Sequence, residues 1–166
     1  MINLINGDCL IALTKIEENS IDLTVTSPPY DNLRNYNGNN AQWGEPVWKS
    51  VIEELYTVTK PGGVVVWVVG DATIKGSETG TSFKQALWAK ECGFNLHDTM
   101  IYQKNSYPFP PVNRYYQQFE YMFVWSKEAP KTYTIQRQPT DPRWRNKDNK
   151  SSSQRKADGT TEKLKW

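Results

Sequence analysis

The chain has 166 residues, with 20 Lys and Arg against 18 Asp and Glu and a formal net charge of +2. This length supports one domain with a substantial core and is too short for two full domains. Two cysteines without metal-ligand spacing and one histidine argue against a disulfide framework and against a metal site. No basic leader or run of eighteen apolar residues is present, so we expect a cytoplasmic protein without membrane contact.

The charges are unevenly distributed along the chain. Residues 127–166 contain 11 Lys and Arg against 5 Asp and Glu, whereas residues 1–126 contain 9 against 13. A basic segment of this kind suits contact with phosphates, although an ordinary solvated tail has the same composition. We therefore divide the chain into a body of residues 1–126 and a basic segment of residues 127–166. Within the basic segment, we expect residues 137–165 to be mobile rather than folded when isolated.

The first thirty residues alternate between strand and helix patterns. Residues 3–5 form a short apolar strand candidate, and apolar side chains at three-residue spacing predict a helix over 9–16. A β-branched apolar run from Ile21 then predicts a buried strand that stops at Ser27, because Pro28 and Pro29 cannot donate ladder hydrogen bonds. This alternation favours an α/β sheet with parallel neighbours.

The later elements continue the α/β pattern. A polar loop over 31–44 precedes a helix with Pro46 at its first position, which residues 60–63 stop. Residues 64–69 predict a strand buried on both faces, and residues 72–80 a loop. Thr81 or Ser82 can cap the next helix, which ends at Gly93. Residues 99–103 and 121–125 are further strand candidates. We expect an α/β fold that forms part of a doubly wound, three-layer αβα sheet.

Ser27, Pro28, Pro29 and Tyr30, which we name the 27–30 motif, follow the central strand. Carboxyl ends of strands are where open α/β sheets bind ligands. The Ser27 hydroxyl and the Pro28 carbonyl can accept hydrogen bonds from an exocyclic amino group while Tyr30 stacks on its ring. A Pro-Pro turn with a packing tyrosine is the plainer interpretation of four residues alone. Trp43 and Trp144 are candidate stacking residues for nucleic acid.

With its context, the 27–30 motif resembles the signature of the amino-methylating DNA methyltransferases. The turn at residues 6–10, residues 60–63, and the block from Lys104 to Lys127 resemble other parts of that family. The resemblance implies a Rossmann-like sheet and methyl transfer from S-adenosylmethionine, in DNA methylation of the restriction-modification kind. Direct attack by the amino nitrogen needs no cysteine nucleophile.

The resemblance also implies residue roles. Ser27, Pro28 and Tyr30 would hold a flipped base of double-stranded DNA, and Pro29 would stiffen the turn. Asp8, Cys9 and Ser27 would contact the cofactor, with Asp8 on its adenosyl part. Ser27 in place of Asp favours cytosine N4 over adenine N6. Basic residues from the later block and the tail would contact DNA: Lys104, Arg114, Arg143 and Arg145.

One departure from the family is clear. In the permuted branch that the chain resembles, a Phe-x-Gly-x-Gly cofactor loop lies far downstream, and this sequence does not contain it. The chain is then the amino-terminal part of a longer enzyme, one subunit of a split enzyme whose partner carries that loop, or a degenerate relative. A non-catalytic nucleic-acid-binding fragment is the alternative function. We also predict pairing of the chain as a homodimer or with a partner chain. An incomplete sheet of this kind is expected to expose an apolar edge.

Overall fold

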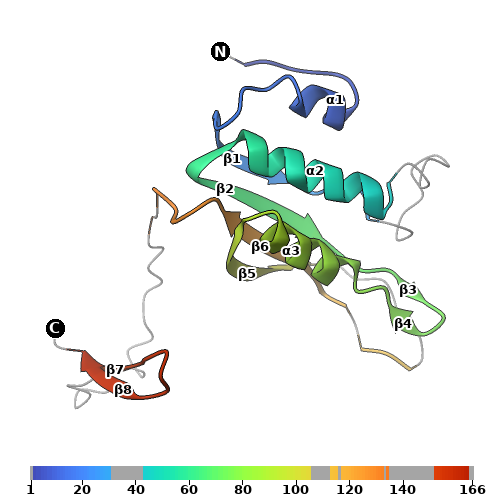
Figure 1. The fold of residues 1–166 in the computed structure, drawn as a ribbon. Coiled ribbons are helices and arrows are strands. Elements are labelled where there is room, and N and C mark those ends of the chain that lie inside the picture. The colour runs from blue at the N-terminus through green and yellow to red at the C-terminus, as the bar shows by residue number, and fades with distance from the viewer. Residues whose placement is uncertain are drawn as a thin grey trace. The chain divides into compact units, whose positions relative to one another are not determined.

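The computed structural model describes residues 2–30, 43–105, 113–115, 117–132, 134 and 152–164. These residues fall into two compact units, Met1–Tyr133 and Thr134–Trp166, which are described separately (Figure 1). The first unit contains these elements: α1 (Cys9–Leu13), β1 (Ile21–Thr26), α2 (Glu45–Val58), β2 (Thr59–Val69), β3 (Thr73–Ile74), β4 (Ser77–Glu78), α3 (Thr81–Glu91), β5 (Asn95–Gln103) and β6 (Phe119–Ser126).

A four-stranded mixed sheet with the order β1-β2-β6-β5 forms the centre of the first unit. β1 and β2 are parallel, as the sequence predicts, whereas β6 runs antiparallel to both β2 and β5. The parallel prediction therefore fails beyond β2. The cause lies in the order of the strands, because β6 returns from β5 and inserts between β5 and β2.

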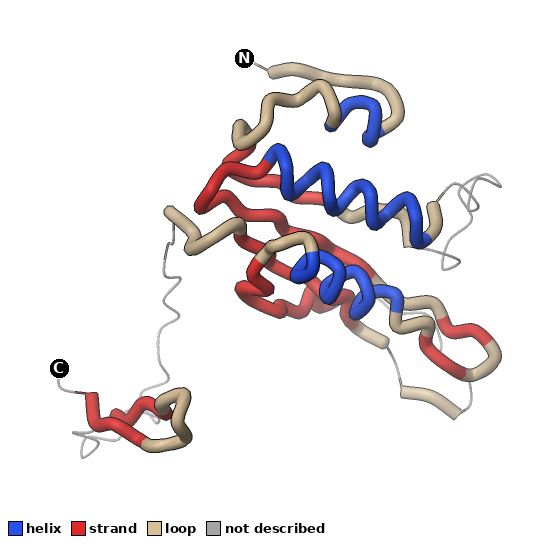
Figure 2. Tube along the Cα trace, in the orientation of Figure 1, coloured by secondary structure: helices blue, strands red, loops and turns tan. Residues whose placement is uncertain are grey.

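The core lies between the sheet and helices α2 and α3, which cover the same face of the sheet (Figure 2). The rings of Trp67 on β2 and Trp125 on β6 stack with their centroids 5.2 Å apart, and both side chains are fully buried. Buried side chains of α2, α3 and β6 surround them: Val51, Ile52, Leu55, Ala86, Ala89 and Phe123. Burial of this apolar surface is the main contribution to the stability of the unit.

The opposite face of β2 is less well covered. Val65, Trp67 and Val69 are buried, but the alternating residues 64, 66 and 68 are only half-buried. The prediction that β2 is buried on both faces is wrong, because the helices that pack on the described sheet, α2 and α3, lie on one face. The described part of the fold is thus an α/β sheet covered on one side, a partial Rossmann-like arrangement.

The amino-terminal elements are shorter than predicted. Residues 3–5 form no strand, and Leu4 is 91 % exposed. A strand needs a neighbour for its backbone groups, and no described residue pairs with this segment. The first helix, α1, has five residues because it ends at Leu13 rather than at residue 16.

Residues 60–63 belong to a strand rather than to a helix stop. β2 begins at Thr59, which pairs with Ile21, and the register with β1 shifts between Ile21 and Leu23. Gly62 has a φ of 82°, which a glycine adopts without strain, so the irregular start of β2 needs this residue. The ladder is regular from Leu23 and its partner Val64 onward.

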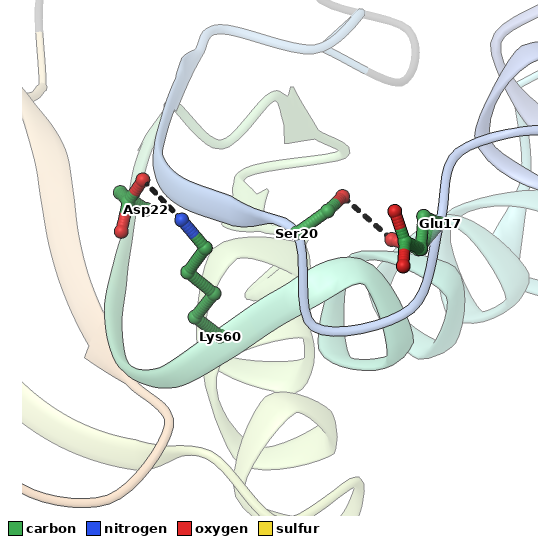
Figure 3. A network of polar contacts seen from close by, with 4 residues as sticks. All are labelled: Glu17, Ser20, Asp22 and Lys60. Carbon is green, nitrogen blue, oxygen red and sulfur yellow. Dashed lines mark hydrogen bonds and ion pairs between the residues drawn. The ribbon is translucent and has the colours of Figure 1, made fainter.

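The start of β1 is held by polar contacts at the surface (Figure 3). The Lys60 ammonium lies 2.7 Å from Oδ2 of Asp22, and the Ser20 hydroxyl donates to the Glu17 carbonyl at 2.6 Å. These contacts are exposed, so each contributes little to stability. They fix the entry of the chain into β1, whose other end carries the 27–30 motif.

The caps of α2 and α3 differ in how well the sequence predicts them. The sequence predicts Pro46 at the first position of α2, and Pro46 is the second residue of this helix, within its first turn. The prediction that Thr81 or Ser82 caps α3 is wrong, since Gly80 is the N-cap residue and Asp71 accepts the hydrogen bond from the backbone N–H of Ser82. The segment predicted as a loop over 72–80 contains the β3–β4 hairpin.

The second unit contains an antiparallel hairpin of β7 (Ser152–Arg155) and β8 (Thr161–Leu164). The sequence predicts a mobile segment over residues 137–165, whereas residues 152–164 form this hairpin. Its turn is stabilised locally because Oδ1 of Asp158 accepts from both the backbone and the hydroxyl of Thr160. The first compact unit extends to residue 133, because Lys127 and Lys131 bond through their backbones to the start of β2.

Candidate functional site

The 27–30 motif follows directly on the last ladder pair of β1, Thr26 with Trp67 of β2. The strand therefore ends where the prolines predict. Pro28 and Tyr30 are buried, whereas Ser27 is exposed. The turn anchors itself in the core through its proline and tyrosine and leaves one hydroxyl accessible at the carboxyl end of a strand.

Ser27 is connected to three further polar groups, those of Tyr30, Glu120 and Lys104. Its Oγ lies 2.8 Å from the Tyr30 hydroxyl, which in turn donates to Oε2 of Glu120 at 2.8 Å. The Lys104 ammonium lies 2.5 Å from Oε1 of Glu120. The fold thus joins residues from the end of β1, from β6 and from the end of β5.

Glu120 is the residue of this group to which the sequence assigned no role. It stands in β6, an otherwise largely apolar strand, and is 7 % exposed. A buried carboxylate requires a charged or hydrogen-bonding partner. A lone acid within an apolar strand is therefore the sequence signal that marks it.

A cavity of about 430 Å³ is lined by Ser27, Pro28 and Pro29 of the motif. It brings Ser27 together with Gly7 and Cys9 of the turn that the sequence predicts to contact the cofactor. Asp8 of the same turn caps α1: its Oδ1 accepts from the backbone N–H groups of Leu10 and Ile11 at 2.8 and 3.3 Å. The direct contact of Asp8 with a cofactor remains a prediction.

The walls of this cavity suit a planar heteroaromatic ligand. Apolar side chains line much of it, among them Leu13, Val51, Leu55 and Trp67. Trp43, predicted as a stacking residue for nucleic acid, also lines it, and its buried indole N–H has no acceptor among the described residues. A largely apolar wall fits the adenine ring of an adenosyl group, and the volume is ordinary for a small-molecule site.

The predicted DNA contacts have different outcomes. Lys104 is turned toward Glu120, as described above, and is partly exposed. The Arg114 guanidinium donates to the Gly76 carbonyl at the β3–β4 turn and lines a second cavity of about 460 Å³, beside the fully exposed Tyr115. Arg143, Trp144 and Arg145 lie outside the described residues. Contact of any of these residues with DNA remains a prediction.

Other ionisable groups do not form a second reactive centre within the described ranges. Burial, and then the charges of Glu53 and Glu91, raises the pKa of the Cys92 thiol to about 11, so this cysteine is a poor nucleophile. No group of His, Cys, Asp and Glu in the described part of the chain is arranged to hold a metal ion. No described helix is long and apolar enough to cross a membrane.

The sheet, with a ligand-sized cavity at the carboxyl end of β1, defines the class as a Rossmann-like methyltransferase fold. Residues 21–166 match the family described as DNA methylase, which comprises the N6 and N4 amino-methyltransferases, and the chain belongs to that family. It is 62 % identical over 129 residues to the orphan methyltransferase M.BamHII of Bacillus amyloliquefaciens, covering 78 % of this chain and 43 % of the relative.

Solved structures show the same fold. The PvuII DNA methyltransferase, described as cytosine-N4-specific, superposes with a TM-score of 0.63 at 25 % identity, over 75 % of this chain and 49 % of that protein. A DNA modification methylase of Thermus thermophilus, complexed with S-adenosyl-L-methionine, superposes with a TM-score of 0.58 at 26 % identity, over 80 % of this chain and 57 % of that protein. The chain thus spans about half the length of these relatives.

Proposed function

We propose that the chain supplies the base-holding part of a DNA methyltransferase. The reaction transfers a methyl group from S-adenosylmethionine to an exocyclic amino group of a base flipped out of double-stranded DNA, with cytosine N4 favoured over adenine N6. The observation that carries this proposal is the exposed Ser27 hydroxyl in a cavity shared with the Gly7 to Cys9 turn. The cytosine-N4-specific description of the similar PvuII enzyme supports the preferred target. Such an enzyme works in the cytoplasm, where it meets DNA.

The proposed reaction needs no covalent intermediate with the protein. S-adenosylmethionine supplies a methyl group on a positively charged sulfur. The amino nitrogen would attack this methyl carbon, the electrons of the carbon–sulfur bond would pass to sulfur, and the nitrogen would lose one proton to solvent. The Ser27 oxygen accepts a hydrogen bond from the amino group and draws its lone pair out of conjugation with the ring. Ser27 and the cavity wall align the two reactants, which is the larger part of such catalysis.

The other residues of the 27–30 motif support Ser27. Pro28 and Pro29 line the same cavity, and the Pro28 carbonyl is the second acceptor for the amino group. Tyr30 is 6 % exposed, so stacking of a base on its ring requires that ring to be uncovered. Its hydroxyl already holds Ser27 at 2.8 Å. Asp8 and Cys9 shape the turn on the cofactor side.

The glycine-rich half of the cofactor site comes from outside this sequence in our proposal. β1 lies at an edge of the described sheet, and its side chains Leu23 and Val25 are 58 % and 66 % exposed. An edge strand with exposed apolar side chains favours pairing with another chain. We propose that a complementing chain that carries the glycine-rich loop, or a second copy of this chain, packs at β1. Lys104, Arg114, Arg143 and Arg145 contact DNA phosphates in the assembled enzyme.

Transfer of a labelled methyl group from S-adenosylmethionine to DNA tests this function. The chain is assayed alone, at concentrations that favour self-association, and together with the product of a neighbouring gene. Transfer in any of these combinations supports the proposal, and analysis of the modified nucleoside separates cytosine N4 from adenine N6. Absence of transfer in every combination contradicts it.

A second candidate function needs only the 27–30 motif and the basic residues of the chain. A part of a methyltransferase that holds a base without binding the cofactor would act as a nucleic-acid-binding module. Calorimetric titration with S-adenosylmethionine in the presence of the complementing chain separates the two candidates, because the assembled cavity beside Ser27 binds the cofactor under the first and does not bind it under the second. Sedimentation of the chain alone shows whether the β1 edge pairs two copies.

A further inference from the structure

Glu120 occupies an unusual position beside the proposed base site. It lies on β6, paired in register with Tyr102 of β5, and is 7 % exposed. Its two carboxylate oxygens have different partners: Oε1 forms the ion pair with Lys104, and Oε2 accepts from the Tyr30 hydroxyl. A carboxylate in an ion pair is ionised, and an ionised carboxylate only accepts hydrogen bonds.

This fixes the direction of the next hydrogen bond. A tyrosine hydroxyl has one proton, and that of Tyr30 points to Glu120. In the 2.8 Å contact between Tyr30 and Ser27, the tyrosine oxygen is therefore the acceptor and the serine hydroxyl is the donor. Because serine also has a single hydroxyl proton, its oxygen presents only lone pairs to a third partner.

We infer that Glu120 is a positioning residue that makes Ser27 an obligate hydrogen-bond acceptor. This inference rests on the proposed function, in which Ser27 contacts the exocyclic group of a base. A free serine hydroxyl donates or accepts equally well and cannot tell an amino group from a carbonyl oxygen at the same ring position. With its proton committed to Tyr30, Ser27 accepts from an amino group and repels a carbonyl.

The consequence is chemical selectivity at the target base. Cytosine and uracil differ at ring position 4 by an amino group and a carbonyl oxygen, and adenine and hypoxanthine differ in the same way at position 6. A site that hydrogen-bonds one group leaves a polar atom unpaired with the other. The hydrogen-bonded series that runs from Lys104 through Glu120 and Tyr30 to Ser27 thus selects a base that carries the amino group to be methylated.

Binding of matched oligonucleotides tests the inference on the full chain without cofactor. Fluorescence anisotropy compares short single strands of deoxycytidine with deoxyuridine, and of deoxyadenosine with deoxyinosine. We expect wild type to prefer the amino-bearing strand in at least one pair by about fivefold to tenfold, the effect of one hydrogen bond. Glu120→Gln lowers the preference to less than about twofold, because an amide donates as well as accepts.

Two further variants keep the test decisive. Tyr30→Phe removes the hydroxyl while keeping the ring, and it is expected to abolish the preference. This variant provides the test if Glu120→Gln fails to fold. Glu120→Asp keeps a carboxylate and restores part of the preference, which a purely structural role would not require. Asp22→Asn is the matched control: it also neutralises a lysine-paired carboxylate, at 2.7 Å from Lys60, at the opposite end of β1, and leaves the preference intact.

The outcomes separate this inference from the proposed function. A wild-type preference that disappears in Glu120→Gln and Tyr30→Phe supports both. A wild-type preference that persists in folded Glu120→Gln and Tyr30→Phe overturns the role of Glu120 and leaves the proposed function standing. Equal binding of both members of each pair by wild type overturns the base-holding role of Ser27, and the inference with it.

Discussion

The carboxylate of Asp71 accepts hydrogen bonds from both the backbone N–H and the hydroxyl of Ser82, eleven residues further along the chain. Asp71 follows the end of β2, and Ser82 lies in the first turn of α3, so this pair ties the helix to the sheet. Both residues are almost fully buried, and the Thr79 hydroxyl also contacts Asp71 at 3.2 Å. One acid thus replaces the helix cap that Gly80 cannot provide.

Replacing Asp71 with alanine is expected to destabilise the fold by about 2–3 kcal/mol, because the buried donors of Ser82 then lack an acceptor. Urea denaturation followed by circular dichroism measures the loss. Asp22→Ala is the control, since the Asp22 side chain is 81 % exposed and its ion pair with Lys60 is worth less than about 1 kcal/mol. Equal losses in the two variants would contradict the structural role of Asp71.

Gly93 lies two residues after the end of α3 and packs against the ring of Tyr56 in α2. Its φ is 112°, and a Cβ atom here would lie 2.7 Å from the Tyr56 hydroxyl oxygen. Tyr56 itself packs edge-on against Phe94, with ring centroids 5.0 Å apart, which limits its freedom to move aside. A side chain at position 93 therefore meets both backbone strain and a steric contact.

Gly93→Ala is accordingly expected to cost about 2–4 kcal/mol of unfolding free energy. Gly76→Ala separates the two contributions, because Gly76 has a φ of 81° but no atom within 4 Å of its Cβ position. This control is expected to lose only about 1 kcal/mol. Thermal or urea unfolding of both variants gives the comparison, and a loss at Gly76 as large as that at Gly93 would show that the contact with Tyr56 is unimportant.

The two cysteines should differ strongly in reactivity. Only the thiolate reacts with iodoacetamide, and with a pKa of about 11 the Cys92 thiol is ionised in about one molecule in a thousand at pH 8. Cys9 is exposed beside the cavity. Peptide mass spectrometry after labelling at pH 8 is therefore expected to find Cys9 modified first, with labelling of Cys92 rising as the pH approaches 11. Faster labelling of Cys92 at pH 8 would contradict the raised pKa. Added S-adenosylmethionine should slow labelling of Cys9 if the cofactor occupies this cavity.

The sequence predicts the local chemistry of this fold better than its long-range pairing. Two adjacent prolines end a strand whatever surrounds them, so the end of β1 before Ser27 is correctly predicted. Pro46 similarly marks the start of α2. The antiparallel insertion of β6 between β2 and β5 is set by tertiary packing, which no local pattern contains.

The candidate site shows the same division. The 27–30 motif and the turn at Cys9, which the family resemblance assigns to one site, line the same cavity. Glu120 was not predicted to act there, because its link to Tyr30 crosses ninety residues and forms only when β6 enters the sheet. The cap of α3 was missed for a related reason, since Asp71 reaches Ser82 across the β3–β4 hairpin.

Ser27→Ala is the sharpest test of the proposed catalytic role. Removing the acceptor is expected to lose about 1.5–3 kcal/mol of transition-state stabilisation, which corresponds to a rate of methyl transfer about 10- to 150-fold lower. Because Ser27 is exposed, the variant should keep the stability of wild type. Ser20→Ala is a matched control at the other end of β1, where the hydroxyl bonds only locally to the Glu17 carbonyl (Figure 3). Single-turnover transfer of a labelled methyl group, in the assembly that shows activity, measures the rates. If Ser27→Ala and Ser20→Ala both transfer at the wild-type rate, Ser27 does not accept a hydrogen bond from the reacting amino group.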